Sequence, residues 1–281
     1  MRLLSSDRSP VRGFVDGLAT GLSVIEAFDD THAELTLSEV ARRAGLTPST
    51  ARRSLHTLES LGYVRQVDRR FMLAARILTL GSTYLRSAHV DDALVPELCR
   101  LVDIFQDASS ISVLDGPNIL YVAHYSAQRA VRPLAGIGVT YPAFATSMGR
   151  VLLAGLDETG LNTYFEQATF AKLTDLTETD PDRLRLVIDD VRRVRYATAV
   201  DQLAYGVTSL AVPIVVHGQT VAAINTSAYS MRVSPQELIE TRLQEVRLSA
   251  DRVATTLLRY PTLLHSFRST PRVHRVDKTA G

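Results

Sequence analysis

Residues 36–67 read TLSEVARRAGLTPSTARRSLHTLESLGYVRQV, and this stretch decides the fold of the N-terminal part of the chain. Its first four residues, TLSE, have the spacing of a capping box, in which the threonine and glutamate side chains each accept a hydrogen bond from the other residue's backbone N–H group. Gly45 stands where a residue in the left-handed conformation ends a helix. Thr47 and Pro48 then open a second helix, as its N-cap and as a first residue whose missing N–H costs nothing. Two short helices joined by Gly-Leu-Thr predict a helix-turn-helix.

Apolar residues recur at intervals of three and four in both of these helices, and also in a segment that precedes them across a polar gap. This spacing predicts three helices, each with one face packed in a shared core. The positions expected in this core are Leu18, Leu22, Ile25 and Phe28 in the first helix, Leu37, Val40, Ala41 and Ala44 in the second, and Ala51, Leu55, Leu58 and Leu61 in the third.

The opposite face of the third helix is polar. It carries small hydroxyl side chains, a histidine and arginines, which can approach base edges and phosphates. A solvent-exposed helix of a small bundle would carry the same residue types, so the segment that follows decides between the two interpretations. The residues on or beside this face are Thr47, Ser49, Thr50, Arg52, Arg53, His56 and Ser60.

The segment after the third helix predicts a β-hairpin with a basic tip. Residues 63–67 and 71–73 have the composition of strands and flank a turn at 68–70. Three helices followed by such a hairpin are the order of a winged helix, whose wing meets phosphates or an adjacent minor groove. Residues 40–76 also hold eight arginines against two acidic residues, which suits a DNA backbone. We therefore expect binding to a double-stranded DNA operator, with wing contacts from Arg65, Arg69 and Arg70.

Length and composition set the wider frame. The chain has 281 residues, more than one typical core, so we expect two domains. No apolar run approaches the roughly 18 residues of a membrane span, and the first residues lack the apolar stretch of a signal peptide, so we expect a cytoplasmic protein. The single cysteine, Cys99, excludes an internal disulfide and a cysteine zinc cluster, and its helical position favours packing over reactivity.

A helical pattern over 75–88 follows the wing directly. We expect a linker helix that also helps to dimerise the chain, because a two-fold operator needs two subunits. The alternative is a helix packed on its own domain. A further helix with Leu94, Leu98 and Phe105 on one face is expected after it.

The remainder of the chain alternates strands and helices. Strands at 110–114 and 119–124 flank the turn residues 115–118, and an irregular strand over 132–139 leads to a helix from about Ser147. Further helices are expected at 157–167, 181–195 and 235–258, and strands at 208–216 and 220–228. Antiparallel hairpins with helices before, between and after them predict an α+β fold. The expected division is a flexible tail 1–11, a winged helix-turn-helix domain 12–74, a linker helix 75–90, an effector-binding domain 91–259 and an extended tail 260–281.

Four segments together resemble the IclR family of bacterial transcriptional regulators. They are FVDGLATGLSVIEAF at 14–28, LTLSEVARRAGLTPSTARRSLHTLESLGYV at 35–64, YPAFATSMGRVLLA at 141–154 and SLAVPI at 209–214. Residues 126–154 are most similar to the branch that regulates protocatechuate and β-ketoadipate catabolism. The resemblance implies a winged helix, a linker helix and a GAF-like effector domain, assembled as a homodimer or dimer of dimers. It also implies control by a small effector, an aromatic or dicarboxylic acid.

The expected effector site lies where the helix at 147 begins. Unpaired N–H groups and the helix dipole favour a carboxylate there, although Thr146 could equally serve as a plain N-cap. The family resemblance implies effector contacts from Ser147, Met148, Ser209, Asn225 and Ser227. An acidic contact of other members falls near Ala199 or Asp201, with the register between these two left open. Because a carboxylate calls for a cation, Arg132 is the candidate partner, with His124 and Arg129 behind it.

Sequence patterns give no sign of an enzyme. The motifs of metalloproteases, of serine hydrolases and of nucleotide-binding P-loops are missing from the sequence, and the seven histidines lack ligand spacing. We expect neither a cofactor nor a metal. Two alternatives stay open: a C-terminal domain that senses a protein partner, or an enzyme domain fused to the DNA-binding one. Contact with RNA polymerase is a further expected interaction.

Overall fold

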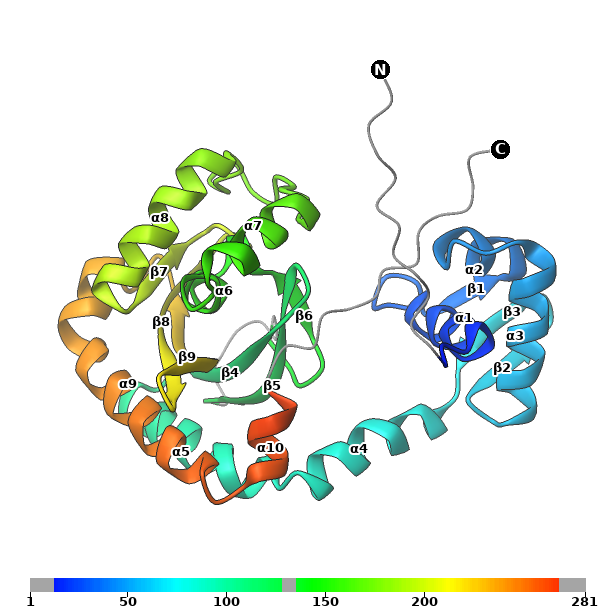
Figure 1. Ribbon diagram of the computed structural model, residues 1–281, viewed down its shortest axis with the longest axis horizontal. Coiled ribbons are helices and arrows are strands. Elements are labelled where there is room, and N and C mark those ends of the chain that lie inside the picture. The colour runs from blue at the N-terminus through cyan, green and yellow to red at the C-terminus, as the bar shows by residue number, and fades with distance from the viewer. Residues whose placement is uncertain (1–12, 128–134, 268–281) are drawn as a thin grey trace. The chain divides into compact units, whose positions relative to one another are not determined.

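The computed structural model describes residues 13–127 and 135–267, and it divides the chain into two compact units (Figure 1). The first unit runs to Tyr84 and the second begins at Leu85. Within the described residues, no helix has the length and apolar character needed to cross a bilayer. The expected tail 1–11 and most of the expected tail 260–281 lie outside the described residues.

The first unit is a winged helix. Its elements are α1 (Asp16–Glu26), β1 (Glu34–Thr36), α2 (Leu37–Arg43), α3 (Pro48–Ser60), β2 (Val64–Val67) and β3 (Arg70–Leu73), with the strands in the antiparallel order β1-β3-β2. The capping box is present, since the Glu39 carboxylate accepts from the Thr36 N–H at 2.7 Å and the Thr36 hydroxyl accepts from the Glu39 N–H at 3.4 Å. Thr47 caps α3 and Pro48 is its first residue. The predicted helix-turn-helix is confirmed.

The buried face of α1 differs from the predicted one. Leu18 and Leu22 are 65% and 49% exposed, whereas Thr20 and Val24 are buried. The buried face includes Thr20, whose hydroxyl donates to the Asp16 carbonyl at 2.7 Å. Because one of its residues is polar, a pattern of apolar residues alone does not identify this face. The prediction for Leu18 and Leu22 is wrong, and both residues leave apolar surface on α1.

Three smaller corrections concern the rest of this unit. Leu61 is 53% exposed because α3 ends one residue earlier and Leu61 is its C-cap. β1 was not expected, since a three-residue strand is too short to show an alternating pattern. It is held by Leu35, which is buried and pairs with Phe71. Arg70 lies in β3 rather than in the hairpin turn, where it pairs with Val67.

The expected linker helix begins as the short 3-10 helix η1 (Ala75–Ile77) and continues as α4 (Leu78–Ser87). None of the residues of α4 is buried, and Leu78 and Leu80 are 70% and 52% exposed. Leu78 and Leu80 therefore leave apolar surface on this helix that no other described residue buries. His89, with a φ of +55°, separates α4 from the next helix.

The second unit is built on one six-stranded antiparallel sheet. The strand order is β6-β5-β4-β9-β8-β7. The strands are β4 (Ala108–Asp115), β5 (Asn118–Ser126), β6 (Thr140–Pro142), β7 (Ala197–Val200), β8 (Val207–Val216) and β9 (Gln219–Tyr229). The α+β fold expected for this domain is confirmed, and its two hairpins lie where the turn residues predicted them.

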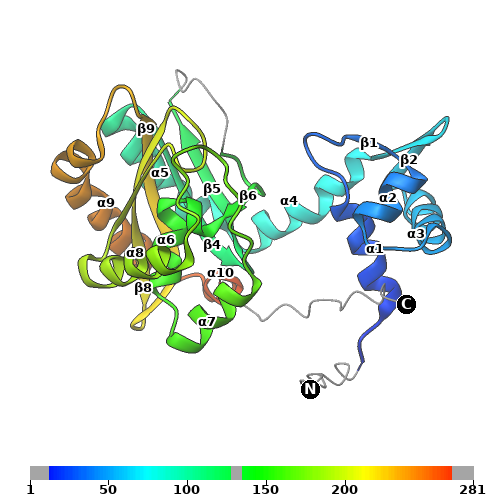
Figure 2. The same cartoon turned by 90° about the horizontal axis from the view of Figure 1, so that it is seen from above.

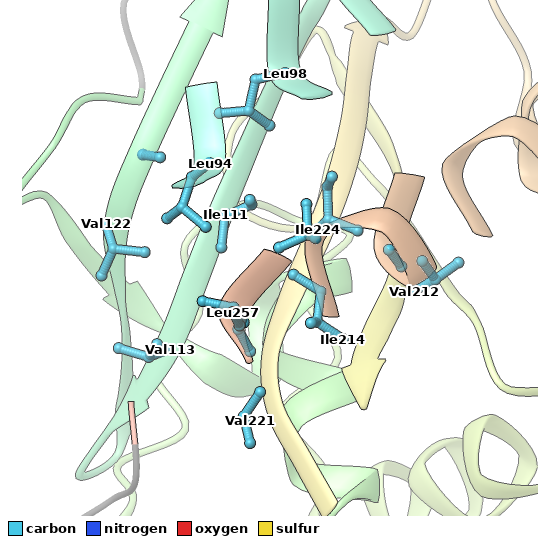
Figure 3. Packing of buried hydrophobic residues seen from close by; sticks show 14 of the residues in the cluster. Leu94, Leu98, Ile111, Val113, Val122, Val212, Ile214, Val221, Ile224 and Leu257 are labelled. Carbon is cyan, nitrogen blue, oxygen red and sulfur yellow. The ribbon is translucent and has the colours of Figure 1, made fainter. Parts of the chain in front are cut away.

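Different helices pack on the two faces of this sheet (Figure 2). α5 (Val90–Phe105) and α9 (Pro235–Leu257) cover one face, and Figure 3 shows Leu94, Leu98 and Leu257 pointing at Ile111 and Ile224 of the sheet. The other face carries α6 (Ser147–Ala154), which is preceded by the 3-10 helix η2 (Ala143–Ala145) and packs against α8 (Pro181–Val194). α7 (Glu158–Gln167) contributes Leu161 and Tyr164 to the same apolar cluster.

Two elements of this unit correct the sequence-based picture. The irregular strand expected over 132–139 is instead the short β6 at Thr140–Pro142; its expected first residues, including Arg132, lie outside the described residues. The tail expected from 260 onward starts with α10 (Pro261–Ser266), whose Leu263 and Leu264, together with Phe267, are buried in the core. Six residues are too few for a helical period to stand out, so only tertiary packing marks this helix.

Candidate functional site

The exposed face of α3 begins with a cluster of hydroxyl groups. The Thr47 hydroxyl lies 3.1 Å from the Ser49 hydroxyl and 2.9 Å from the Thr50 hydroxyl, and it accepts from the Thr50 N–H at 3.3 Å. One turn further on, Arg53 and His56 are exposed. The helix is held in the core by its opposite face, on which Ala51, Leu55 and Leu58 are buried. This packing leaves the polar face, as predicted, on the surface of the unit.

Several arginines of the first unit have no partner among the residues that the structure describes. Among the described residues, none forms an ion pair with the predicted DNA-contacting arginines, and only Arg70 has a hydrogen bond, to the Glu34 carbonyl at 3.5 Å. The unpaired side chains are Arg52, Arg53, Arg65 and Arg69. Arg43 and Arg76 differ, because Arg43 binds Asp29 and the Ala27 carbonyl, while Arg76 stacks over the Tyr63 ring. The unpaired set lies on α3 and the hairpin, the two parts of a winged helix that meet DNA.

The second candidate site is the sheet face that meets α6. Residues that pair across neighbouring strands point to the same side of a sheet. The pairing of the strands therefore places two rows of residues across this face. One row runs Ser126, Ala108, Ser227, Ser209, Ala199, and the other runs His124, Ser110, Asn225, Ala211, Ala197. Hydroxyl and amide groups therefore gather on β4, β5, β8 and β9, and alanines leave short side chains beside them.

The start of α6 lies against these rows. The Ser147 hydroxyl is 2.8 Å from the Ser209 hydroxyl, and the Ser112 hydroxyl donates to the Met148 sulfur at 3.2 Å. Thr146 accepts a hydrogen bond from the Gly149 N–H at 2.9 Å, so it is the N-cap of this helix, the alternative role that the sequence allowed. The N–H groups of Ser147 and Met148, the first two of the helix, have no hydrogen-bond acceptor among the described residues. Two donors at a helix start are an anion-binding arrangement.

Arg150 adds a buried positive charge close to this helix start. Its guanidinium donates to the Phe144 carbonyl at 3.0 Å, the Thr198 carbonyl at 3.2 Å and the Gln202 side-chain oxygen at 2.8 Å. Burial lowers the pKa of Arg150 to about 10, with Glu178 acting in the opposite direction, so the side chain stays charged at neutral pH. All three acceptors are neutral oxygens. Glu178 is close enough to raise the pKa of Arg150, but among the described residues it forms no ion pair with that side chain.

The middle of the face is held by Asn225 and Ser110. The Asn225 side-chain oxygen accepts from the Ser110 N–H at 2.9 Å, and the Ser110 hydroxyl lies 2.9 Å from Nδ1 of His124. Ser209 and Asn225 are buried and Ser227 is half-buried. Burial lowers the pKa of His124, so its imidazole is neutral at pH 7.

One of the predicted effector contacts, Asp201, makes hydrogen bonds of its own elsewhere. One carboxylate oxygen of Asp201 accepts from the Gly206 N–H at 2.8 Å, the Val207 N–H at 3.1 Å and the Ser230 hydroxyl at 2.9 Å, which holds the turn between β7 and β8. Ala199, not Asp201, takes the place beside Ser209 in the row. Arg132, like Arg129, lies outside the described residues.

Sequence reasoning missed Arg150, Ser110 and Ser112. Arg150 carried a usable signal, because an arginine inside the apolar helix SMGRVLLA has to be buried against oxygen atoms. The two serines alternate with apolar residues in β4, but only the register of the sheet shows which face they share with Asn225.

Comparison with known proteins places both units in one family. The model of the IclR helix-turn-helix domain matches residues 17–68, and the model of the bacterial transcriptional regulator IclR C-terminal domain matches residues 82–255. The chain is 36% identical over 241 residues to the Pca regulon regulatory protein of Pseudomonas putida, which covers 85% of this chain and 82% of that protein.

Two further relatives have names that mention an aromatic acid. The p-hydroxybenzoate hydroxylase transcriptional activator of Acinetobacter baylyi is 34% identical over 88% of this chain and 93% of its own length. The crystal structure of an IclR homologue from Microbacterium hydrocarbonoxydans, in complex with 4-hydroxybenzoate, superposes with a TM-score of 0.70 at 26% identity, over 86% of this chain and 99% of that one.

Proposed function

The chain belongs to the IclR family of bacterial transcriptional regulators, and we propose that it binds a two-fold DNA operator as an oligomer and responds to a small aromatic acid. It is a DNA-binding regulator controlled by an effector rather than an enzyme, as its relatives are named regulators throughout. The operator, the acid and the transcription machinery all meet in the bacterial cytoplasm, where we propose that it acts. A contact with RNA polymerase belongs to the same proposal.

We assign the DNA contacts to α3 and the wing. Arg53 and His56 lie at the centre of the exposed face, where α3 would enter the major groove and read base edges. The hydroxyl cluster at the start of the helix and the unpaired arginines would bind phosphates or the minor groove. The assigned residues are Thr47, Ser49, Thr50, Arg52, Arg53, His56, Arg65, Arg69 and Arg70.

The observation that carries the effector class is the set of hydrogen-bond donors at the start of α6. Two helix N–H groups without an acceptor among the described residues lie in the same helix as Arg150, whose acceptors are neutral oxygens. An effector carboxylate would satisfy both the donors and the charge. Ser147, Ser209, Asn225 and Ser227 would supply hydroxyl and amide contacts beside it. Asp201 has its own bonds in the β7–β8 turn and is left out of this proposal.

Exposed apolar side chains in the first unit support the proposed oligomer. The exposed leucines of α1 and α4 leave apolar surface that a second copy of the chain would cover, and each copy would present one α3 to one half of the operator. Effector binding would then favour one arrangement of the oligomer, and DNA binding or promoter activity would follow that shift.

A thermal-shift screen tests the effector class most directly. Hydroxybenzoates, benzoate, protocatechuate and aliphatic dicarboxylic acids are each added to the full chain, and every acid that raises Tm is then tested in gel shifts with operator DNA. We expect aromatic monocarboxylates to raise Tm, because a ligand that binds only the folded state stabilises it. Stabilisation by aliphatic dicarboxylates alone, or by no acid at all, would contradict the proposed effector class.

A further inference from the structure

His124 occupies a distinctive place on the effector face of the sheet. It is opposite Ser110 in the row that continues through Asn225 to Ala211 and Ala197. Of the ten residues in the two rows, all of which the structure describes, His124 alone has an ionisable side chain. It is half-buried and comes from β5, at the opposite end of the rows from β7.

Polar groups lie at both ends of this face, with Asn225 and Ser227 of β9 between them. At one end, the Ser209 hydroxyl of β8 meets the Ser147 hydroxyl at the start of α6. At the other end, the His124 ring meets Ser110. β8 and β5 are three strand spacings apart, about 14 Å. A benzene ring with polar groups at opposite ends, each hydrogen-bonded to a side chain, can span such a distance, and a ligand with a single polar group would satisfy only one end.

The His124 end is suited to a hydroxyl group. Its Nδ1 is paired with the Ser110 hydroxyl at 2.9 Å, and its Nε2 has no hydrogen-bond partner among the described residues. A neutral imidazole offers Nε2 either as donor or as acceptor, depending on which nitrogen carries the proton. A phenolic hydroxyl can form a hydrogen bond with Nε2 in both cases because it donates and accepts, whereas a carboxylate only accepts.

We propose that His124, oriented by Ser110, binds the ring hydroxyl of a hydroxylated aromatic acid and so sets the specificity of the effector site. The carboxylate of the same molecule lies at the start of α6. This inference rests on the proposed effector class and goes beyond it by naming the residue that distinguishes hydroxylated from unsubstituted acids. Sites that pair a ligand hydroxyl discriminate strongly against analogues that lack it, because the buried partner is then left unpaired.

Calorimetric titration of 4-hydroxybenzoate and benzoate into the full chain tests the proposal. The wild type should bind 4-hydroxybenzoate about 10-fold more tightly than benzoate, the effect of one well-made hydrogen bond. His124→Leu should bring this ratio close to one and leave the Kd for benzoate nearly unchanged. His124→Gln, which keeps a hydrogen-bonding group, should retain part of the preference, and Ser110→Ala should weaken it. His265→Leu, an exposed histidine of α10, is the matched control.

The outcomes separate the two levels of the argument. A preference for 4-hydroxybenzoate that survives in His124→Leu, His124→Gln and Ser110→Ala overturns the inference and leaves the proposed effector class intact. An equal loss of affinity for both acids in His124→Leu also overturns the inference, because His124 would then act on the carboxylate or on the fold. If the wild type binds neither acid, the effector class and the inference both fall. Circular dichroism spectra and Tm values of each variant show that it is folded.

Discussion

Arginine side chains of this chain have two different uses. Some are bonded within the protein: Arg242 is buried between Asp107 at 2.8 Å and the Thr226 hydroxyl at 3.1 Å, and its guanidinium lies over the Phe105 ring. On α3 and the hairpin the arginines have no ion-pair partner among the described residues. Charges that the fold does not use are available for a phosphate backbone or for base edges.

The double substitution Arg53→Ala with His56→Ala tests the assigned reading positions. Sequence preference should disappear, with a loss of about 1–3 kcal/mol for each base contact, while weak salt-dependent binding persists. Competition gel shifts with operator and scrambled duplexes measure the preference. Arg193→Ala, an exposed arginine of α8, is the matched control. Undiminished preference in the double variant would show that α3 does not read the operator.

Gly149 is required by a close contact at the start of α6. A Cβ atom at this position would lie 2.0 Å from the Ala143 carbonyl oxygen, which is backbone and has little room to move. Gly149→Ala should therefore lower Tm and weaken effector binding, by an amount that differential scanning calorimetry and titration report. Gly81→Ala in α4, where nothing lies within 4 Å, should hold or raise Tm. A Gly149→Ala protein as stable as the wild type would contradict this contact.

Prediction from sequence succeeds best at this scale where the signal is local. Thr36, Glu39 and Thr47 could be assigned because each acts on a backbone group within three residues of itself. Arg43 and Arg150 could not be assigned in the same way, because their acceptors lie 16 and 48 residues away in the chain and come close only after folding.

At the scale of elements, α5 and α9 are joined by a cluster of charges. Glu97 pairs with Arg100 at 3.0 Å and with Arg252 at 2.9 Å, and Glu245 completes the cluster. Burial raises the pKa of Glu97, but the hydrogen bonds and charges of the two arginines outweigh it, so the net shift is downward. A carboxyl group whose pKa is lower in the folded state stabilises the fold above its unfolded pKa.

This cluster gives a pH-dependent prediction. The stabilisation from Glu97 is complete above its ordinary pKa of 4.5 and is lost as pH falls from there through the lower folded pKa. In Glu97→Gln the free energy of unfolding should therefore be lower at neutral pH, and the difference from the wild type should shrink on acidification. Urea unfolding at a series of pH values measures it, with Glu240→Gln on the exposed side of α9 as control. A difference independent of pH would show that Glu97 contributes through packing only.

Long elements could be predicted from the sequence, and so could short ones with a local signal, such as the two strands of the wing. The helices at 158–167, 181–194 and 235–257 agree with the predicted ranges to within one residue, because each has several apolar turns or a clear cap. β1, β6, β7 and α10 have three to six residues, and they are fixed by pairing or packing with distant segments. The same limit applied to the effector site, because the serines of β4 become part of it only through the register of the sheet.

At the scale of the whole molecule, a partner copy of the chain is needed to bind both halves of a two-fold operator. Leu78→Glu with Leu80→Glu places charges on the exposed apolar face of α4, at positions that are 70% and 52% exposed in the single chain. The fold should survive, while the oligomer dissociates at concentrations where the wild type does not, and operator affinity should fall with it. Sedimentation velocity measures the assembly. Met231→Glu, also a highly exposed apolar position, is the control.

Unchanged sedimentation of the α4 variant would place the interface between copies elsewhere. If the α4 variant dissociates yet binds the operator with wild-type affinity, one copy suffices for recognition. The proposal of a two-fold operator would then be wrong.

The central claim is that an aromatic acid bound in the C-terminal domain controls transcription through the winged helix. In vitro transcription tests it most directly, on a template that carries the operator selected by the chain from genomic DNA. We expect 4-hydroxybenzoate or a related hydroxylated aromatic acid to change transcript yield about 5-fold or more, only when the protein is present and only with an intact operator. Equal yields with and without every acid of this class would contradict it.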